Sequence, residues 1–428
     1  IRMLDETGLF PDVLHINEGH ASLAFFERIK IMMKKYGINY EKAYELNKKT
    51  SVFTTHTPVV HGNEEFEPKH FNNYLQDYFA ELKMNITDVR KFSSIDGRKA
   101  KKIMMTLLGL KMAGFTNGVS RLHGDTASKM WQEVPNINIG YITNGIHLNT
   151  WLSSEMQELL RQFTGIDPFS GKLEDVTAID QISDHVLRDI KNGLKLKLLN
   201  YVNHRYKLNI KYDNNFIIGF ARRFARYKQA DMIFKDSRLL EKVFKDPRVI
   251  LFIAGKAHPK DTDGRQILRH VINSIKTYGL EDQVFFLENY DIELGKKLVQ
   301  GTDAWLNTPL RPMEACGTSG MKAAVNAGIN ISIPDGWWEE AYNGNNGFMI
   351  AKPETPEDKQ LEEISKILSE KLIPMYYSEE EKEKAQYANI MREAVKTTLD
   401  KFNSFRMFNE YHKKYYKNAL ENMNNFVK

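Results

Sequence analysis

One segment of the chain, residues 311–340, concentrates the residue types that could do chemistry. Within a dozen positions it carries a carboxylate (Glu314), the only cysteine (Cys316) and a lysine (Lys322) around a Gly/Thr/Ser turn. Such a turn, where it opens a helix, leaves backbone N–H groups unpaired, which suits an anion. A lysine in the first turn of a helix is electrostatically unfavourable, so we expect this amine to have a chemical role. The alternative is a structural turn followed by a surface lysine.

A second segment carries four cations in seven positions, namely Arg222, Arg223, Arg226 and Lys228. A run of charges is usually a solvent-exposed face. These residues directly follow an apolar run that predicts a buried strand, so we expect them at an edge of a sheet. Arginine offers paired hydrogen bonds to phosphate and lysine a point charge, which favours a phosphate site.

Further polar residues follow predicted strands in the first third of the chain: Glu18, His20, His56 and Asn144. In open α/β sheets, ligands bind beyond the carboxyl ends of the strands. We therefore expect these side chains near a ligand. Helix capping by Asn17 or Glu18 and a purely structural histidine are the alternatives.

The pattern of apolar residues predicts an α/β chain of two to three domains. Strands are expected at 13–16, 51–54, 137–142, 216–221 and 329–333, and within RVILFIAGK and DQVFFLENY. Helices are expected at 21–36, 67–93, 98–114, 178–206, 321–327, 359–372, 379–399 and 401–424.

Composition excludes several classes of protein. Hydrophobic residues make up 42% and charged residues 27%, and the net charge is only +5, so neither a nucleic-acid nor a membrane partner is indicated. One cysteine cannot form an internal disulfide, which fits a cytoplasmic protein, and no zinc spacing or Walker-type motif occurs. The chain opens on Ile1 rather than methionine, and we expect the beginning of its first domain to lie outside it.

Together these motifs resemble the α-glucan phosphorylases, the glycogen, starch and maltodextrin enzymes that use pyridoxal phosphate, and most closely their short prokaryotic branch. Glu314 and Lys322 keep the spacing of the family's EASGT segment, which ends in a lysine eight positions after its glutamate. The resemblance implies that Lys322 forms the Schiff base with the cofactor. It also implies two sets of ligands around this lysine. Thr318 and Ser319 would hold the cofactor phosphate, and the glucosyl unit would contact Glu314, Ala315, Cys316 and Gly317.

The other motif residues are also given roles by the resemblance. The basic segment resembles the family's K-R-x-x-x-Y-K sequence. Its implied roles are substrate-phosphate ligands for Arg223 and Lys228, a cofactor-phosphate cation for Arg222, and a sugar contact for Tyr227. Elsewhere the implied roles are cofactor neighbours for Trp151 and Tyr290, sugar ligands for His56 and Asn144, and an acceptor-side pair for Glu18 and His20.

The resemblance implies two Rossmann-like domains facing each other across a cleft, the GT-B arrangement. We expect a partial first domain at 1–148 on the glucan side, a second at 149–400 on the cofactor and phosphate side, and a helix at 401–428 that returns to the first. The implied reaction is reversible phosphorolysis of α-1,4-glucan or maltodextrin by inorganic phosphate to glucose 1-phosphate, with the cofactor phosphate relaying a proton. A homodimer is one expected assembly.

The sequence departs from the family at several positions, and two other functions stay open. Cys316 replaces a serine, Asp291 stands where many members carry arginine, and Ala225 and Arg226 replace a His-Glu pair. The family's N-terminal glycine loop has no counterpart. A nucleotide-sugar glycosyltransferase of the same architecture would need no Schiff-base lysine. An inactive glucan-binding protein is the third hypothesis.

Overall fold

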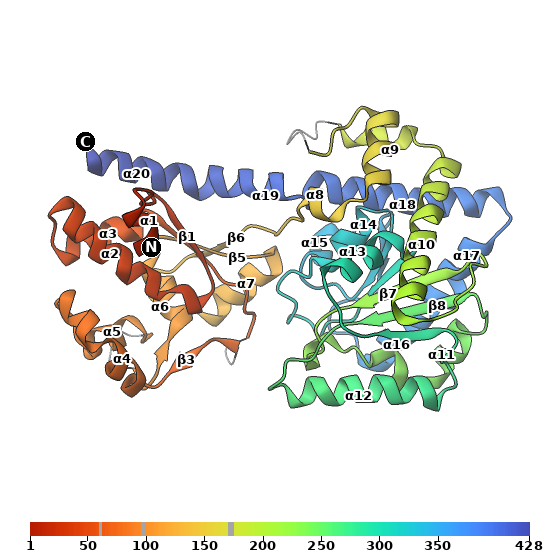
Figure 1. Ribbon diagram of the computed structural model, residues 1–428, viewed down its shortest axis with the longest axis horizontal. Helices are drawn as coiled ribbons and strands as arrows, with labels where there is room; N and C mark the ends of the chain where they lie inside the picture. The colour runs from red at the N-terminus through yellow and green to blue at the C-terminus, as the bar shows by residue number, and fades with distance from the viewer. Residues whose placement is uncertain (60–61, 96–99, 170–174) are drawn as a thin grey trace. The chain divides into compact units, whose positions relative to one another are not determined.

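The computed structural model describes residues 1–59, 62–95, 100–169 and 175–428. Contacts divide the chain into two units (Figure 1). The first unit comprises residues 1–143 together with 407–428, and the second comprises residues 144–406. No helix among the described residues is long and apolar enough to span a membrane.

A parallel sheet forms the centre of the first unit. Within the described residues it has the strand order β1-β2-β5-β6, with bounds Leu14–Asn17, Ser51–Thr54, Phe115–Gly118 and Ile139–Tyr141. Every residue of β2 is buried, as expected of a strand covered on both faces. The register pairs Asn17 with Thr54 and Thr54 with Asn117, so these strands end at one edge of the sheet. The residues that follow β1 and β2 therefore emerge side by side.

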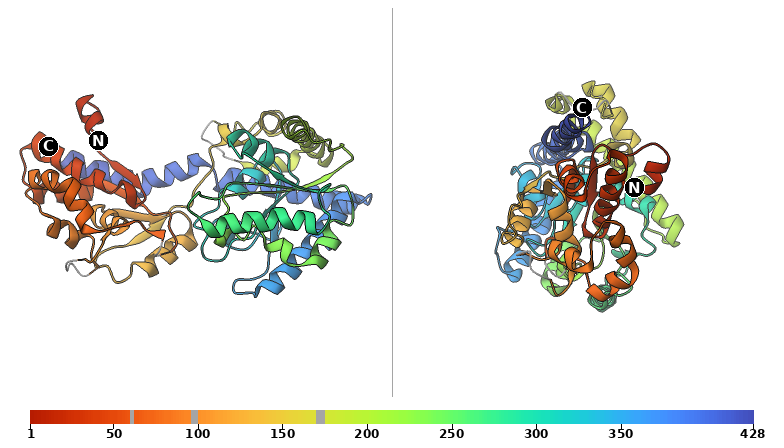
Figure 2. Two further views of the ribbon diagram at one scale, coloured as in Figure 1. Left: turned by 60° about the horizontal axis from the view of Figure 1, so that its bottom comes forward. Right: turned by 90° about the vertical axis from the view of Figure 1, so that its left-hand side faces the viewer.

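Helices cover this sheet, and a helix from the end of the chain joins them. Their bounds are α1 Arg2–Glu6, α2 Leu23–Tyr36, α3 Tyr40–Lys49, α4 Pro68–Glu81, α5 Ile86–Phe92, α6 Met105–Met112, α7 Arg121–Met130 and α20 Lys417–Val427. Figure 2 shows α20 alongside α3, and the two helices are in contact. Met423 of α20 is buried in the same core as Phe25, Phe53 and Leu107. The last helix thus completes the core of the first unit.

One predicted helix of this unit was partly wrong. The prediction covered 98–114, but the helix begins at Met105, and residues 98–99 lie outside the described part of the chain. The preceding residues form β4 (Ile103–Met104), which pairs antiparallel with β3 (Glu65–Phe66). Two-residue strands are too short to show a period in the sequence.

The second unit contains a larger parallel sheet. In the described residues its order is β12-β11-β10-β7-β8-β9. The bounds are β7 Phe216–Ala221, β8 Val249–Ala254, β9 Val284–Leu287, β10 Ala304–Asn307, β11 Ile329–Ser332 and β12 Gly347–Met349. β10 and β12 were not predicted, because an apolar run of three or four residues has no distinguishing period. With the central sheet of each unit parallel, the predicted α/β fold is confirmed.

The strand order creates a switch point between β7 and β10. From β7 the chain proceeds through β8 to β9 on one side, and it returns to the other side of β7 for β10, β11 and β12. Ligands of open parallel sheets bind at the carboxyl ends of strands where the order reverses in this way. The basic segment follows β7 and the 311–340 segment follows β10, so the topology brings the two chemical segments to one place.

Helices lie on both faces of this sheet. Figure 1 shows α10, α13 and α14 on one side of β7 and β8 and α11, α12 and α16 on the other. The bounds are α8 Leu148–Trp151, α9 Ser154–Thr164, α10 Asp184–Tyr206, α11 Ser237–Val243, α12 Thr262–Thr277, α13 Ile292–Gly301, α14 Ser319–Ala324, α15 Trp338–Ala341, α16 Glu357–Ser365, α17 Ile373–Tyr377 and α18 Glu381–Lys401. After α18 comes α19 (Ser404–Tyr411), and π-helical turns lie at Lys366–Leu372 and His412–Tyr416.

Local chemistry explains several helix ends. The carboxylate of Asp291 accepts the Leu294 N–H at 2.9 Å and caps α13, which gives this departure from the family a structural reason. Helix α14 starts at Ser319 and ends at Ala324, earlier than the predicted 321–327. It ends there because Ala327 adopts a left-handed conformation (φ 60°) and the Gly328 N–H turns back to the Ala323 carbonyl.

A buried ion pair holds the centre of the second sheet. The ammonium group of Lys195 on α10 lies 2.9 Å from the carboxylate of Asp303, and both side chains are at most 1% exposed. Asp303 also accepts the Ile217 N–H of β7 at 2.7 Å, and Lys195 donates to the Tyr376 hydroxyl at 2.6 Å. The pair therefore links α10, β7 and the chain entering β10.

Replacing Lys195 by methionine should destabilise the protein by roughly 3–5 kcal/mol, because it leaves the Asp303 carboxylate buried without a counter-ion. Urea unfolding at neutral pH measures this free energy. The control is Lys359→Met, which removes an exposed pair with Glu362 and should leave stability nearly unchanged. Equal effects of the two substitutions would contradict the structural role of the buried pair.

Candidate active site

The segments after β7 and β10 are held together by hydrogen bonds to backbone carbonyls. The Leu310 N–H donates to the Tyr227 carbonyl at 2.7 Å, and the Thr308 hydroxyl donates to the Gln229 carbonyl at 3.1 Å. The two predicted chemical segments therefore lie against each other at the switch point.

Glu314 forms the centre of this arrangement. Its Oε1 accepts from Nζ of Lys228 at 2.5 Å, its Oε2 also contacts this ammonium group, and the guanidinium of Arg222 donates to Oε2. All three residues are buried. We call this cluster of Glu314, Arg222 and Lys228 the ion triad. It is one carboxylate shared by two of the cations that the sequence suggested for phosphate.

Burial and charge oppose each other within the ion triad. Burial alone would raise the pKa of Glu314, but Arg222 and Lys228 outweigh it, and the pKa lies below its ordinary value. Burial, reinforced by Arg222, lowers the pKa of Lys228 to about 8, although Glu314 favours its charged form. The carboxylate is thus ionised at neutral pH, and the triad keeps an excess of positive charge.

Arg222 retains unused hydrogen-bond donors. Its Nε and Nη1 are buried and have no hydrogen-bond partner within the described part of the chain. An unsatisfied buried donor costs about 1–3 kcal/mol. These two nitrogens are therefore donors that an oxyanion could use.

The backbone beneath Glu314 is fixed by a residue that the sequence did not single out. The buried carboxylate of Asp335 accepts the Glu314 N–H at 2.9 Å and the Gly336 N–H at 2.8 Å, and burial raises the pKa of Asp335 to about 7. Gly317 has φ 77°, and a Cβ there would lie 3.0 Å from Cγ of Glu314. Asp335 follows strand β11, and this position at a strand end was the signal that could have identified it.

Lys322 presents a different kind of amine. It is half-buried, and its Nζ lies 3.6 Å from the centroid of the Trp151 ring. In the described chain it has no carboxylate partner, and burial alone lowers its pKa to about 8. An amine of this kind is partly neutral near physiological pH, and a neutral amine is a nucleophile.

Asn326, another residue that the sequence did not reveal, ties this lysine to Trp151. Its side-chain amide donates to the carbonyls of Trp151 and Lys322, at 2.9 and 2.8 Å, and accepts the Ser153 N–H at 2.8 Å. Asparagines are buried and hydrogen-bonded to the backbone at many places in folded proteins. The presence of an asparagine at this position therefore does not identify it as a residue of the site.

The turn that opens α14 is also anchored. The Ser319 hydroxyl accepts from the Trp305 indole at 3.2 Å and donates to Asn307 at 3.3 Å, and both partners belong to β10. Thr318 is the residue preceding the helix, and its side chain makes no capping hydrogen bond there. The two hydroxyls therefore lie one turn before Lys322.

The remaining predicted residues of this unit lie in different environments. Arg223 is exposed, and its guanidinium reaches the Tyr227 hydroxyl at 3.4 Å. The Tyr227 ring lies under the ammonium group of Lys228, at 4.6 Å from its centroid. Arg226 is exposed, and the structure does not bring it into the triad. Tyr290 is half-buried, and burial raises the pKa of its phenol.

Cys316 and Asn144 are neighbours. A backbone hydrogen bond from Asn144 reaches the buried thiol of Cys316, whose pKa is raised by burial. The Asn144 carbonyl accepts from Arg406 at 3.2 Å. Ala315 lies between Glu314 and Cys316 and is half-buried. A thiol with a raised pKa stays protonated at neutral pH, so Cys316 is not a nucleophile here.

In the first unit, Glu18 and His56 meet at the ends of β1 and β2. The Glu18 carboxylate accepts the His56 N–H and lies 3.7 Å from Nδ1 of its ring. Burial lowers the pKa of His56 although Glu18 opposes this shift, so the imidazole is neutral at pH 7. Glu18 itself has φ 67°, an uncommon conformation for a residue with a side chain. A neutral imidazole can exchange hydrogen bonds with a hydroxyl group.

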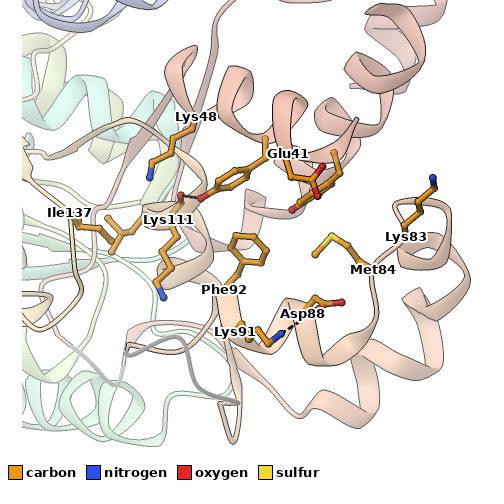
Figure 3. Close-up of a pocket in the computed structure, with 12 residues that line it drawn as sticks. Glu41, Lys48, Lys83, Met84, Asp88, Lys91, Phe92, Lys111 and Ile137 are labelled. Carbon is orange, nitrogen blue, oxygen red and sulfur yellow. Dashed lines mark hydrogen bonds and ion pairs between the residues drawn. The ribbon is translucent and has the colours of Figure 1, made fainter. Parts of the chain in front are cut away.

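His20 is exposed and lines a pocket of about 630 Å³ with several aromatic residues. Its walls include Glu64, Phe66, His70, Phe71 and Tyr74. Another pocket of the first unit, of about 530 Å³, contains none of the predicted site residues (Figure 3). Lysines and aromatic side chains of α3, α5 and α6 line it.

No group of three or more potential metal ligands occurs in the described residues.

Comparison with known proteins places these residues in a family. A family model described as carbohydrate phosphorylase matches residues 9–418. The chain is 34% identical to the maltodextrin phosphorylase of Thermococcus litoralis, over 99% of this chain and 53% of that protein. It is 33% identical to the glycogen phosphorylase of Aquifex aeolicus (98% and 64%) and 31% identical to that of Mycobacterium tuberculosis (96% and 52%). The chain therefore spans between 52% and 64% of the length of these relatives.

Replacing Glu314 by glutamine should destabilise the protein by roughly 3 kcal/mol at pH 7, because two buried cations lose their counter-ion. The folded pKa of Glu314 lies below its unfolded value, so its contribution is present above about pH 4.5 and is lost as the pH falls through the folded pKa. Urea unfolding of both proteins over this range measures the difference. A difference that persists at the lowest pH would contradict an ionic origin.

Proposed function

The chain belongs to the carbohydrate phosphorylase family, and on that premise we propose that the protein is an α-glucan phosphorylase. It would transfer the terminal glucosyl unit of an α-1,4-glucan or maltodextrin to inorganic phosphate, giving glucose 1-phosphate, and would catalyse the reverse reaction. The ion triad at the switch point supports this most directly, because phosphorolysis needs a fixed anion site beside a sugar site.

Phosphorylases of this family generally use pyridoxal phosphate, and the residues around Lys322 suit that cofactor. The amine of Lys322 is half-buried and free of any carboxylate among the described residues, as a group that must react with an aldehyde should be. The Thr318 and Ser319 hydroxyls and the unpartnered nitrogens of Arg222 are donors suited to a phosphate. Trp151 and Tyr290 would complete the walls. When bound, the cofactor supplies its phosphate as an acid–base group.

The substrate phosphate would bind to Lys228 and Arg223. Lys228 is buried and charged, which suits a dianion that must be held still, and Arg223 is exposed beside it. Arg223 already reaches the hydroxyl of Tyr227, a contact that orients its guanidinium. Fixed cations offset the repulsion between two neighbouring phosphates and stabilise charge that develops in the transition state.

The glucosyl unit would lie beside Glu314, with hydrogen bonds from the 314–317 segment and from Asn144. In the first unit, His56 would hydrogen-bond a sugar hydroxyl as a neutral imidazole oriented by Glu18. Glu18 and His20 would meet the remainder of the glucan. The glycosidic C1–O bond breaks, an oxygen of the substrate phosphate bonds to C1, and the proton carried by that phosphate is transferred to the leaving O4.

The cofactor proposal predicts that pyridoxal phosphate attaches covalently to Lys322. Because the neutral amine reacts, the rate of attachment should rise with pH through about 8, not through the usual value near 10.4. Absorbance of the bound cofactor follows the reaction, and borohydride reduction with peptide mapping locates it.

Lys322→Arg, which keeps the charge but cannot react, should abolish attachment. Lys296→Arg, at another half-buried lysine, on α13, is the matched control and should attach the cofactor normally. Cofactor found on another lysine in the unaltered protein would refute the assignment.

The activity proposal predicts phosphate-dependent release of glucose 1-phosphate from maltodextrin. Replacing Lys228 by methionine should lower kcat/KM for phosphate by roughly 10- to 100-fold, the loss expected for one hydrogen bond to a charged group. Lys235→Met, which removes a surface pair with Glu357, should leave it unchanged. Transfer from a nucleotide-sugar instead, with no phosphorolysis, would favour the glycosyltransferase hypothesis.

A further inference from the structure

We propose that Glu314 is an exchangeable counter-ion that couples the phosphate site to the sugar site. Without phosphate, the Glu314 carboxylate is paired with Lys228. When phosphate binds to Lys228 it displaces the carboxylate. The free carboxylate then binds hydroxyl groups of the glucosyl unit. Phosphate and sugar would therefore each strengthen the binding of the other. The inference rests on the proposed function and adds the physical link between its two ligands.

The ion triad leaves little of the carboxylate for a sugar. Glu314 accepts from Lys228 through both oxygens and from Arg222 through Oε2. A carboxylate offers about four lone-pair sites, so most of its capacity is taken by the two cations. The Glu314 residue is also only 8% exposed. In this arrangement its side chain neutralises buried charge and cannot serve as a full ligand for hydroxyl groups.

Phosphate would replace the carboxylate and not join it. A dianion bound to Lys228 with Glu314 still in place would bring two anions into contact with one ammonium group, and like charges at such distances repel strongly. Phosphate has more charge and more acceptor oxygens than a carboxylate. It can therefore neutralise the positive charges of Arg222 and Lys228 in place of the carboxylate.

The exchange needs only side-chain rotation. The Glu314 backbone is held by the bond of its N–H to Asp335, while the hydrogen bonds of its side chain within the described residues go to the two cations. Releasing the cations therefore frees the carboxylate without moving the loop. The coupling is reciprocal by thermodynamic necessity, so sugar must raise phosphate affinity by the factor by which phosphate raises sugar affinity.

Calorimetric titration of the cofactor-loaded protein with inorganic phosphate, with and without saturating glucose, tests this directly. Glucose has no glycosidic bond to cleave, so binding is measured without turnover. In the unaltered protein glucose should lower the phosphate Kd by about tenfold, within the usual range for coupled sites. In Glu314→Gln, phosphate should bind more tightly than in the unaltered protein, and glucose should change its Kd by less than about twofold, because no carboxylate is exchanged.

Glu339→Gln is the matched control, since it removes a carboxylate paired with Arg311 at 2.6 Å in the same segment without touching the ion triad. It should keep both the phosphate affinity and the coupling. The inference is wrong if glucose does not change the phosphate Kd of the unaltered protein, a measurement that needs no variant to fold. It is also wrong if the coupling persists in Glu314→Gln. Because neither result depends on glucose 1-phosphate release, loss of activity would count against the proposed function alone.

Discussion

The second unit depends on one carboxylate shared between two buried cations. Without Glu314, Arg222 and Lys228 would place two positive charges at the buried edge of a parallel sheet, an arrangement that costs several kcal/mol. The strand order brings the three residues together, since β7 and β10 are neighbours although 82 residues lie between the end of β7 at Ala221 and the start of β10 at Ala304. The ion triad therefore belongs to the fold as much as to the chemistry.

Two lysines of this unit have similar pKa values for different physical reasons. Lys228 and Lys322 both have a pKa of about 8. Lys228 keeps a carboxylate partner that favours its charge, so it is suited to bind an anion. Lys322 has the face of Trp151 beside it, and burial is the one cause of its shift, so it is suited to react as a neutral amine. A pKa of about 8 thus suits anion binding by Lys228 and nucleophilic attack by Lys322.

The sequence predicted those strands that form continuous apolar runs, and those site residues that directly follow such runs. Strands Ser51–Thr54 and Phe216–Ala221 were predicted with the bounds that the structure has, because continuous apolar or β-branched runs mark buried strands. The short strands β10 and β12 left no such pattern. The basic segment and Glu314 were both singled out, but their direct contact follows from the strand order, which periodicity does not encode. Asp335 and Asn326 act through hydrogen bonds to backbone groups, and residue type alone does not reveal such bonds.

A double-mutant cycle between Glu314 and Lys228 tests the central claim most directly. The free energies of unfolding are measured for the unaltered protein, Glu314→Gln, Lys228→Met and the double variant at pH 7. If the two residues form a buried ion pair, the double variant should be more stable than the sum of the single effects implies, by about 2 kcal/mol, within the range of residues in contact. Additivity to within about 0.5 kcal/mol would show that the two side chains do not interact, and the account of the site would fail.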